Sequence, residues 1–230
     1  MIIEPLKPTF QRLKSIRTRK LSILRSLEHE TISGIEVQGI TLDIGGGSRA
    51  SYNKIIRNRG TIHSLNISPE FNPTFLADAN KPWPINDSTY DNIISFNTLE
   101  HLWNDTFAVS EALRVLKPGG YFHIIVPFLY RVHGSPYDFH RHTHESWQLI
   151  LEQNGIPSNI QKIEPLVWDS MATAFSFLER TRLNIFKPLA LLVGVLRCLN
   201  LKGDRLPVDV AVHWREWSLG YYISGKKPSI

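Results

Sequence analysis

A buried acid followed by three consecutive glycines constrains this chain more than any other stretch. The apolar run 40–44 contains Asp43 and leads into glycines 45–47, after which a helix is expected near residues 50–54. Glycine adopts positive φ without steric strain and lets the backbone come close to a ligand. A strand, a glycine turn and a helix in this order are typical of a nucleotide-binding crevice.

The charge of Asp43 helps to decide which nucleotide the crevice suits. Residues Gly45, Gly47 and Ala50 also satisfy the loose dinucleotide pattern. A carboxylate two residues before the first glycine repels a pyrophosphate but attracts a cationic ligand. S-adenosylmethionine carries a sulfonium and an ammonium, so the pattern favours it, and an NAD(P)-dependent oxidoreductase is kept as an alternative.

Length and composition indicate one α/β domain. The chain has 230 residues, of which 42% are hydrophobic and 20% charged, enough for a sizeable core. Its one cysteine, Cys198, excludes an internal disulfide and favours a reducing compartment. No basic region followed by a long apolar run begins the chain, so we predict no signal peptide and a cytoplasmic location.

Two segments flank or interrupt this predicted domain. We predict a basic helical segment over residues 1–36, a domain over 37–230 and a helical insert over about 169–209. The apolar helix expected over 185–200 is too short to span a bilayer, which needs about 20 apolar residues. Both the basic segment and this helix are candidates for peripheral membrane contact. The alternative for the basic segment is a solvated helix face, and the alternative for the apolar helix is a helix that covers the core or forms a homodimer contact.

Apolar runs and helical patterns alternate along the domain. The expected elements are strands at 40–44, 61–67, 75–80, 90–97, 121–127, 159–168 and 220–226, with helices at 9–30, 105–116 and 145–154. This alternation predicts a Rossmann-like, doubly wound, seven-stranded and mostly parallel sheet with a helical insert before the last strand. Ligands of such sheets lie at the carboxyl ends of the strands, where the polar candidates gather.

Three segments in the expected order resemble the class I S-adenosylmethionine-dependent methyltransferases. They are the Asp43 glycine turn, the fourth strand running into Leu99-Glu100-His101, and Leu116-Lys117-Pro118-Gly119-Gly120 before the fifth strand. The resemblance covers residues 38–155. It implies S-adenosylmethionine as cofactor, held by Asp43, Gly45, Gly46, Gly47, Asn66, Ile67, Asp78, Ala79, Asn97 and Leu99.

Two of these positions have particular roles in the family. Asp78 matches the acid that hydrogen-bonds the adenine amino group, with a plain loop aspartate as the alternative. Asn66 stands where the family usually has an acid that holds both ribose hydroxyls. An amide offers one acceptor oxygen and a donor, so we expect a weaker grip, and a turn-forming asparagine is the alternative.

The long loop 128–144 is rich in aromatic residues, histidine and arginine, which argues against disorder. It leaves the carboxyl end of the fifth strand, so we predict that it binds the methyl acceptor. Its sequence resembles that of bacterial methyltransferases of surface-polysaccharide and other glycan pathways. The predicted acceptor-binding residues are Tyr130, Arg131, His133, Tyr137 and Arg141.

Proton removal from a hydroxyl or amine acceptor needs a base within hydrogen-bond reach. His101 and His140 are the candidates by position, and Asp138 is a candidate to orient a histidine or to act as base itself. Histidines that are only solvated are the alternative. A metal set could be made of His133, Asp138, His140, His142 and His144, the last three of which would share one side of an extended segment. No carboxylate-rich or cysteine set completes such a site, so we predict no metal.

We therefore predict a methyltransferase acting on a hydroxyl or amine of a small molecule or glycan, including lipid-linked sugars. The segment after the fourth strand, Asn97-Thr98-Leu99-Glu100, lacks the Pro-Pro motif of nucleic-acid amino-methyltransferases, which disfavours a nucleic-acid base as acceptor. Two alternatives stay open: a methyltransferase-like cofactor-binding protein without activity, and the oxidoreductase.

Overall fold

The computed structural model describes residues 21–134, 136–168, 170–177, 189, 192–193, 196 and 216–229. The chain divides into two compact units. One unit comprises residues 31–126, 132–163 and 222–230, and the other comprises 1–30, 127–131 and 164–221. All the residues of the candidate site described below except two belong to the first unit.

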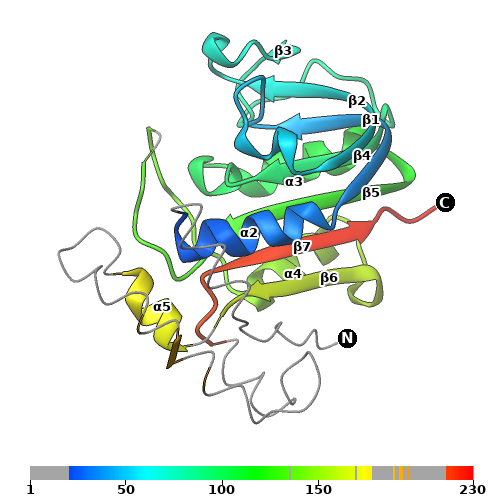
Figure 1. Ribbon diagram of the computed structural model, residues 1–230. Coiled ribbons are helices and arrows are strands. Elements are labelled where there is room, and N and C mark those ends of the chain that lie inside the picture. Colours follow the sequence, from blue (N-terminus) through cyan, green and yellow to red (C-terminus); the bar gives the residue numbers. More distant parts are fainter. Residues whose placement is uncertain are drawn as a thin grey trace. The chain divides into compact units, whose positions relative to one another are not determined.

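A seven-stranded sheet forms the centre of the fold (Figure 1). Its strands are β1 (Glu36–Ile44), β2 (Arg57–Asn66), β3 (Phe75–Leu76), β4 (Tyr90–Phe96), β5 (Leu116–Pro127), β6 (Gln161–Leu166) and β7 (Gly220–Lys226). Their order is β3-β2-β1-β4-β5-β7-β6. β1 pairs in parallel with β2 and β4, β2 with β3, and β4 with β5. The predicted doubly wound α/β fold is confirmed.

The last strand runs against its neighbour β5. Gly119 N donates to Lys227 O at 2.9 Å and Lys227 N donates to Gly120 O at 2.8 Å, while Phe128 N donates to Leu219 O at 2.7 Å. The start of β5 therefore meets the end of β7, and the end of β5 meets its start. The sheet is mostly parallel, with β7 antiparallel to β5.

The helices agree in part with the pattern predicted from sequence. They are α2 (Ile23–Ser33), α3 (Asp105–Val115), α4 (His144–Gln153) and α5 (Ser170–Ser176). The Thr143 side chain caps α4 by accepting from Ser146 N at 3.2 Å. Residues 1–20, which include more than half of the predicted basic segment and residues 9–20 of the predicted first helix, lie outside the described residues. So do most residues of the predicted insert and of the predicted 185–200 helix. Within the described residues, no helix is both long and apolar enough to cross a membrane.

Several local predictions differ from the structure. The helix expected after the glycine turn is a single 3-10 turn, η1 (Ser51–Lys54), and β2 begins at residue 57 instead of 61. The Pro-Gly-Gly segment expected to precede the fifth strand lies inside β5, where Gly119 has φ +77° and the pairing with β4 is irregular. The third strand has only two residues.

The early start of β2 has a physical reason. A Cβ on Gly60 would lie 1.9 Å from Gly39 O, so only glycine lets β1 and β2 approach at this register. The central strands carry the core, since Leu42, Ile93 and Ile94 are fully buried. The parallel strands of this rigid sheet bring their carboxyl ends to one edge, which is where ligands of such sheets bind.

Candidate functional site

Asp43 lies near the end of β1 and is 1% exposed. The Tyr52 hydroxyl, on η1, lies 2.9 and 2.8 Å from its two carboxyl oxygens and donates to them. Burial raises the pKa of Asp43 to about 7, although the hydrogen bond from Tyr52 acts in the opposite direction. The carboxyl therefore changes charge close to neutral pH, and a nearby cation would favour its ionised form.

The glycines after Asp43 are required by close contacts within the chain itself. A Cβ on Gly46 would lie 1.7 Å from Asp43 Oδ2. Gly45 has φ +80°, and a Cβ there would lie 2.2 Å from Thr98 Oγ1. The sequence analysis predicted close approach to a ligand, and the structure shows that the loop first packs against its own carboxylate and the residue after β4.

The third glycine of the loop contacts the short 3-10 turn η2 (Pro69–Phe71). A Cβ on Gly47 would lie 2.7 Å from Phe71 O. The same carbonyl accepts from Ser48 N at 2.9 Å and from Ser48 Oγ at 3.1 Å. The glycine loop is thus held from two sides, by η2 and by the residues that follow β4.

Asn66, at the end of β2, braces this loop. Its Nδ2 donates to Gly45 O at 2.8 Å and to Gly46 O at 3.0 Å, and its Oδ1 accepts from Ser68 N at 2.9 Å. The amide thus links the end of β2 to the loop after β1. An ionised carboxylate could not donate these hydrogen bonds, because it has no proton. Its predicted contact with ribose stays a prediction.

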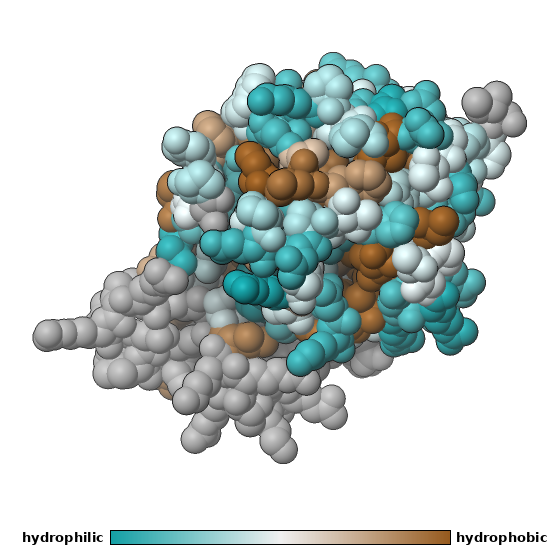
Figure 2. All heavy atoms as spheres, turned by 90° about the horizontal axis from the view of Figure 1, so that it is seen from above, coloured by the Kyte–Doolittle hydropathy of each residue, from teal (hydrophilic) through white to brown (hydrophobic). Residues whose placement is uncertain are grey.

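Hydrophobic side chains are exposed beside the ends of β2 and β3. Ile67 is 68% exposed and Leu76 is 61% exposed. Figure 2 views the molecule from above β3 and shows a mainly hydrophilic face interrupted by groups of hydrophobic residues. Of the predicted cofactor residues, Ile67 is therefore placed to offer an apolar surface to a ligand.

Asp78 and Ala79 follow β3. Asp78 Oδ1 accepts from Asn80 N and Nδ2, both at 3.0 Å, and Lys81 Nζ lies 3.7 Å from Asp78 Oδ2. Burial alone would raise the pKa of Asp78, but the hydrogen bonds from Asn80 and the charge of Lys81 outweigh it and lower the pKa. Ala79 is buried, and its carbonyl accepts from Trp83 Nε1 at 3.3 Å.

Asn97 and Leu99 come directly after β4 and differ in character. Asn97 has φ +54°, a conformation that non-glycine residues seldom adopt outside turns and functional sites. Its Nδ2 is buried, and it has no hydrogen-bond acceptor among the described residues. Leu99, in the 3-10 turn η3 (Leu99–His101), is 1% exposed and belongs to the core. Asn97 is therefore the stronger ligand candidate.

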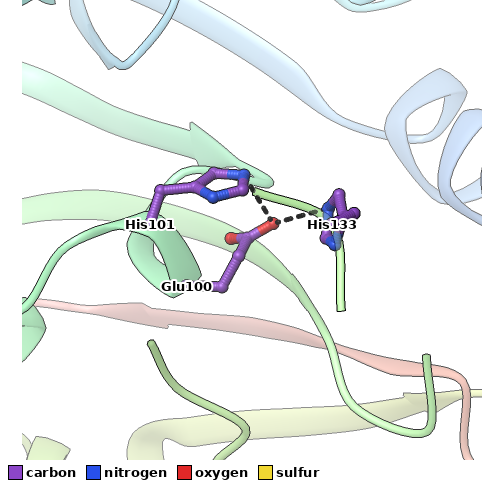
Figure 3. A group of neighbouring side chains, drawn as sticks. All are labelled: Glu100, His101 and His133. Atoms are coloured by element: carbon purple, nitrogen blue, oxygen red, sulfur yellow. Dashed lines mark ion pairs between the residues drawn. The ribbon is translucent and has the colours of Figure 1, made fainter. Parts of the chain in front are cut away.

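Glu100, His101 and His133 form a cluster that sequence reasoning did not foresee (Figure 3). Glu100 Oε1 lies 3.6 Å from His101 Nε2 and 3.8 Å from His133 Nε2. The two imidazole centroids are 5.2 Å apart. Glu100 and His101 come from η3, and His133 comes from the loop after β5. The cluster therefore brings His101, a predicted base, next to His133, which was predicted to bind the methyl acceptor.

Asp138 organises the same loop. Its carboxylate accepts from Arg141 Nη1 at 2.5 Å, from Arg141 Nη2 at 2.6 Å and from His133 N at 2.8 Å. Burial raises the pKa of Asp138, but the hydrogen bonds from Arg141 and His133 outweigh it and lower the pKa to about 2. A carboxylate this acidic is a poor proton acceptor near pH 7, so the geometry favours the orienting role for Asp138.

A second cluster joins His140 and His142 to Asp105 at the start of α3. His142 Nε2 lies 2.7 Å from Asp105 Oδ2, and its Nδ1 lies 3.0 Å from Ser146 Oγ. His140 Nε2 lies 3.8 Å from Asp105 Oδ1 and 3.3 Å from the Trp103 carbonyl oxygen. His140 thus has different partners from His101.

The remaining predicted acceptor residues fall in different places. Tyr137 is 64% exposed, and its carbonyl oxygen lies 2.5 Å from His101 Nδ1. Tyr130 and Arg131 belong to the other compact unit, where the Arg131 guanidinium carbon lies 5.5 Å from the centre of the Tyr130 ring. Sequence reasoning missed Tyr52 as the partner of Asp43, and the only available signal was its position nine residues after the acid.

Comparison with known proteins supplies the family context. Residues 42–124 match a family model described as a methyltransferase domain. A curated protein of Mycolicibacterium smegmatis, described as a probable S-adenosylmethionine-dependent methyltransferase, is 43% identical over 44 residues. The match covers 19% of this chain and only 17% of the length of that relative.

Solved structures share the fold at low sequence identity. A chain in the complex of the Haloferax volcanii Trm112 methyltransferase activator with a methyltransferase gives a TM-score of 0.54 at 17% identity, covering 95% of both chains. A SAM-dependent methyltransferase from Archaeoglobus fulgidus gives 0.51 at 16% identity, covering 95% of this chain and 100% of that one. The [4+2]-cyclase SpnF gives 0.50 at 16%, covering 90% and 82%. One fold therefore carries more than one chemistry.

Proposed function

We propose that the chain is a class I S-adenosylmethionine-dependent methyltransferase and that it transfers a methyl group to a hydroxyl or amine of a small molecule or glycan, including lipid-linked sugars. The observation that carries this proposal is Asp43, a buried acid beside a glycine loop at the carboxyl end of β1. An inactive cofactor-binding protein is the alternative that the experiment below distinguishes.

The residues at this strand end fit the cofactor. Among the described residues, no lysine, arginine or histidine forms an ion pair with Asp43. The ammonium group of the cofactor would therefore provide a positive partner for this buried carboxylate. Asn97 Nδ2 offers a buried donor without an acceptor in the described chain. We assign Asp43 and Asn97 to the amino-acid end of the cofactor, and Ile67 and Asp78 to its adenosine end.

When bound, S-adenosylmethionine supplies a methyl carbon on a positive sulfur, which leaves with the carbon–sulfur electron pair as a neutral thioether. The chain must align the acceptor with that carbon and remove one proton from it. His101 suits proton removal, since the Tyr137 carbonyl can only accept a hydrogen bond and so fixes the proton on Nδ1. The lone pair is then on Nε2, which points to Glu100.

The acceptor loop has features that suit a sugar. Tyr137 and Phe139 are 64% and 47% exposed, and their ring centroids are 5.7 Å apart. Adjacent aromatic faces provide an apolar surface for the carbon–hydrogen face of a sugar ring, while Arg141 and the histidines supply polar partners. These contacts favour a glycan over a purely apolar small molecule as acceptor.

Calorimetry with S-adenosylhomocysteine and NAD tests the cofactor assignment. We expect heat from the first ligand and none from the second, and a lower affinity for the first ligand in Asp43→Asn. Binding of NAD alone would refute the proposal. Labelled S-adenosylmethionine incubated with fractionated glycans and small molecules then tests transfer, and cofactor binding without labelled product would favour the inactive alternative.

A further inference from the structure

We propose that Glu100, His101 and His133 bind one divalent transition-metal ion of the zinc type. From the sequence, Asp138 and the loop histidines were considered as a metal set and no metal was predicted; Glu100 and His101 were not part of that set. In the structure, the loop after β5 brings His133 to the buried Glu100, and His101 stands beside it (Figure 3). The binding itself is independent of the proposed function.

The three donor atoms have nearly the spacing that an ion requires. Glu100 Oε1 lies 3.6 and 3.8 Å from the two Nε2 atoms, and all three atoms lie within 4.8 Å of one another. Ligand atoms around a tetrahedral zinc ion, each about 2.0–2.2 Å from it, lie about 3.3–3.6 Å apart. The two Glu100–histidine distances need shifts of a few tenths of an ångström at most, and the two histidine donor atoms, which lie within 4.8 Å of one another, need a shift of up to about 1 Å.

In each histidine, the ring nitrogen Nδ1 lies close to a hydrogen-bond acceptor, as is usual for histidines that bind a metal through Nε2. His101 Nδ1 faces the Tyr137 carbonyl at 2.5 Å, and His133 Nδ1 lies 3.2 Å from Asp138 Oδ2. Both acceptors favour the proton on Nδ1, which leaves a lone pair on each Nε2. Arg141 Nη2 lies 3.5 Å from His133 Nδ1, but it donates to Asp138 at the shorter distance of 2.6 Å.

Burial and access both suit an ion. The Glu100 side chain is 1% exposed, whereas those of His101 and His133 are 16% and 27% exposed. A divalent ion between the three groups would place positive charge directly beside this buried carboxylate. The partly exposed imidazoles leave a path from solvent to the donor atoms.

The neighbouring cluster lacks this arrangement and provides a control. His142 has both ring nitrogens engaged, Nε2 with Asp105 at 2.7 Å and Nδ1 with Ser146 at 3.0 Å. An ion there would have to displace a short hydrogen bond. The Glu100 cluster is therefore the better ligand set.

The donor types indicate the kind of ion. Two imidazole nitrogens and one carboxylate oxygen suit zinc and similar ions, whereas magnesium prefers oxygen ligands. Three protein ligands leave a fourth position open, as in catalytic zinc sites. If the proposed function holds, that position would receive the acceptor hydroxyl and lower its pKa, so that its proton passes to solvent water near neutral pH. With the ion bound, His101 would be a ligand, and the ion would replace it as the group that promotes proton loss.

Metal titration of the chelator-treated full chain tests the site without measuring activity. Calorimetry with ZnCl2 should give one ion per chain, CoCl2 should produce visible absorption bands, and MgCl2 should give no binding. Glu100→Gln and His133→Gln should abolish the zinc signal. Asp138→Asn should weaken zinc binding about 10–100-fold, because His133 Nδ1 would lose its charged hydrogen-bond acceptor. His142→Gln should still bind one ion. Circular dichroism of each metal-free variant checks that it folds.

Two outcomes would overturn the proposal: no zinc binding by the wild-type chain, or undiminished binding by folded Glu100→Gln and His133→Gln. Loss of the ion in His142→Gln alone would assign it to Asp105 instead and would also refute the proposal. A parallel titration with S-adenosylhomocysteine separates the two hypotheses. Zinc binding without cofactor binding would support the metal site and refute the methyltransferase function. Cofactor binding without zinc binding would refute the metal site and leave the methyltransferase function in place.

Discussion

Cofactor affinity should depend on pH through Asp43. Burial raises the pKa of this carboxyl to about 7, so about 3% of it is ionised at pH 5.5 and about 76% at pH 7.5. If the cofactor ammonium binds only the ionised form, S-adenosylhomocysteine should bind about 20-fold more tightly at pH 7.5 than at pH 5.5. An α-amino group stays largely protonated over this range.

Two variants isolate this carboxyl. Asp43→Asn should abolish the pH dependence, because an amide does not ionise there. Tyr52→Phe removes the hydrogen bond that lowers the pKa of Asp43. A hydrogen bond to a charged group contributes about 1.5–3 kcal/mol, so the pH midpoint should rise by about 1–2 units.

Calorimetry across the pH range, repeated in buffers of different ionisation enthalpy, measures both the affinity and the protons released on binding. Near pH 6.5 the wild-type chain should release most of one proton per ligand bound. Asp87→Asn serves as control, since this side chain is 75% exposed and should leave the pH dependence unchanged. A flat wild-type affinity, or the same slope in Asp43→Asn, would refute the electrostatic reasoning.

Three further predictions concern stability. Asn66→Asp should lower the free energy of unfolding by about 1–3 kcal/mol in urea, because a carboxylate has no proton to donate to the loop carbonyls; a more stable variant would contradict this. Gly46→Ala should lower it by a similar amount, about 1–3 kcal/mol, because the new Cβ would lie 1.7 Å from Asp43 Oδ2; an unchanged urea midpoint would show that the loop adapts. Burial lowers the pKa of His123 to about 4, so the unfolded chain takes up a proton between pH 6.5 and 4 that the native chain does not, and stability should fall as the pH drops through this range. His123→Phe should reduce that slope in urea unfolding at several pH values, and an unaltered slope would exclude His123 as its source.

Asp43 and His123 should affect stability in opposite directions. The native chain keeps the Asp43 proton up to about pH 7, whereas the unfolded chain releases it near pH 3.8, so this contribution falls as the pH rises between those values. The His123 contribution rises over much of the same interval. The two partly cancel in the wild-type chain, and single variants are needed to reveal either one.

Much of the fold could be predicted from local patterns. β4 is a run of mainly apolar residues and was expected at 90–97, and β7 was expected at the residues where it occurs, 220–226. Strong periodicity and flanking glycines carry this information. The position of Asp43 and Asn97 at strand ends followed from the same patterns, because parallel strands bring their carboxyl ends to one edge.

The details of the site depend on contacts that no local pattern records. Asn66 braces the glycine loop through carbonyls about twenty residues away in sequence. Glu100 meets His133 because of an aperiodic loop whose shape is set by the hydrogen bonds of Asp138 and Arg141. Sequence spacing placed His140 and His142 on one side of the loop, and in the structure both lie beside Asp105, but it could not show that His133 lies beside Glu100.

The placement of β7 between β5 and β6 has a consequence for synthesis. While the chain is still on the ribosome, the strands before residue 220 can pair, but β5 and β6 keep unpaired backbone groups until β7 emerges and inserts between them. Unpaired strand edges are templates for intermolecular association. Until residues 220–226 join the sheet, the facing edges of β5 and β6 are therefore places where the nascent protein can associate with other chains.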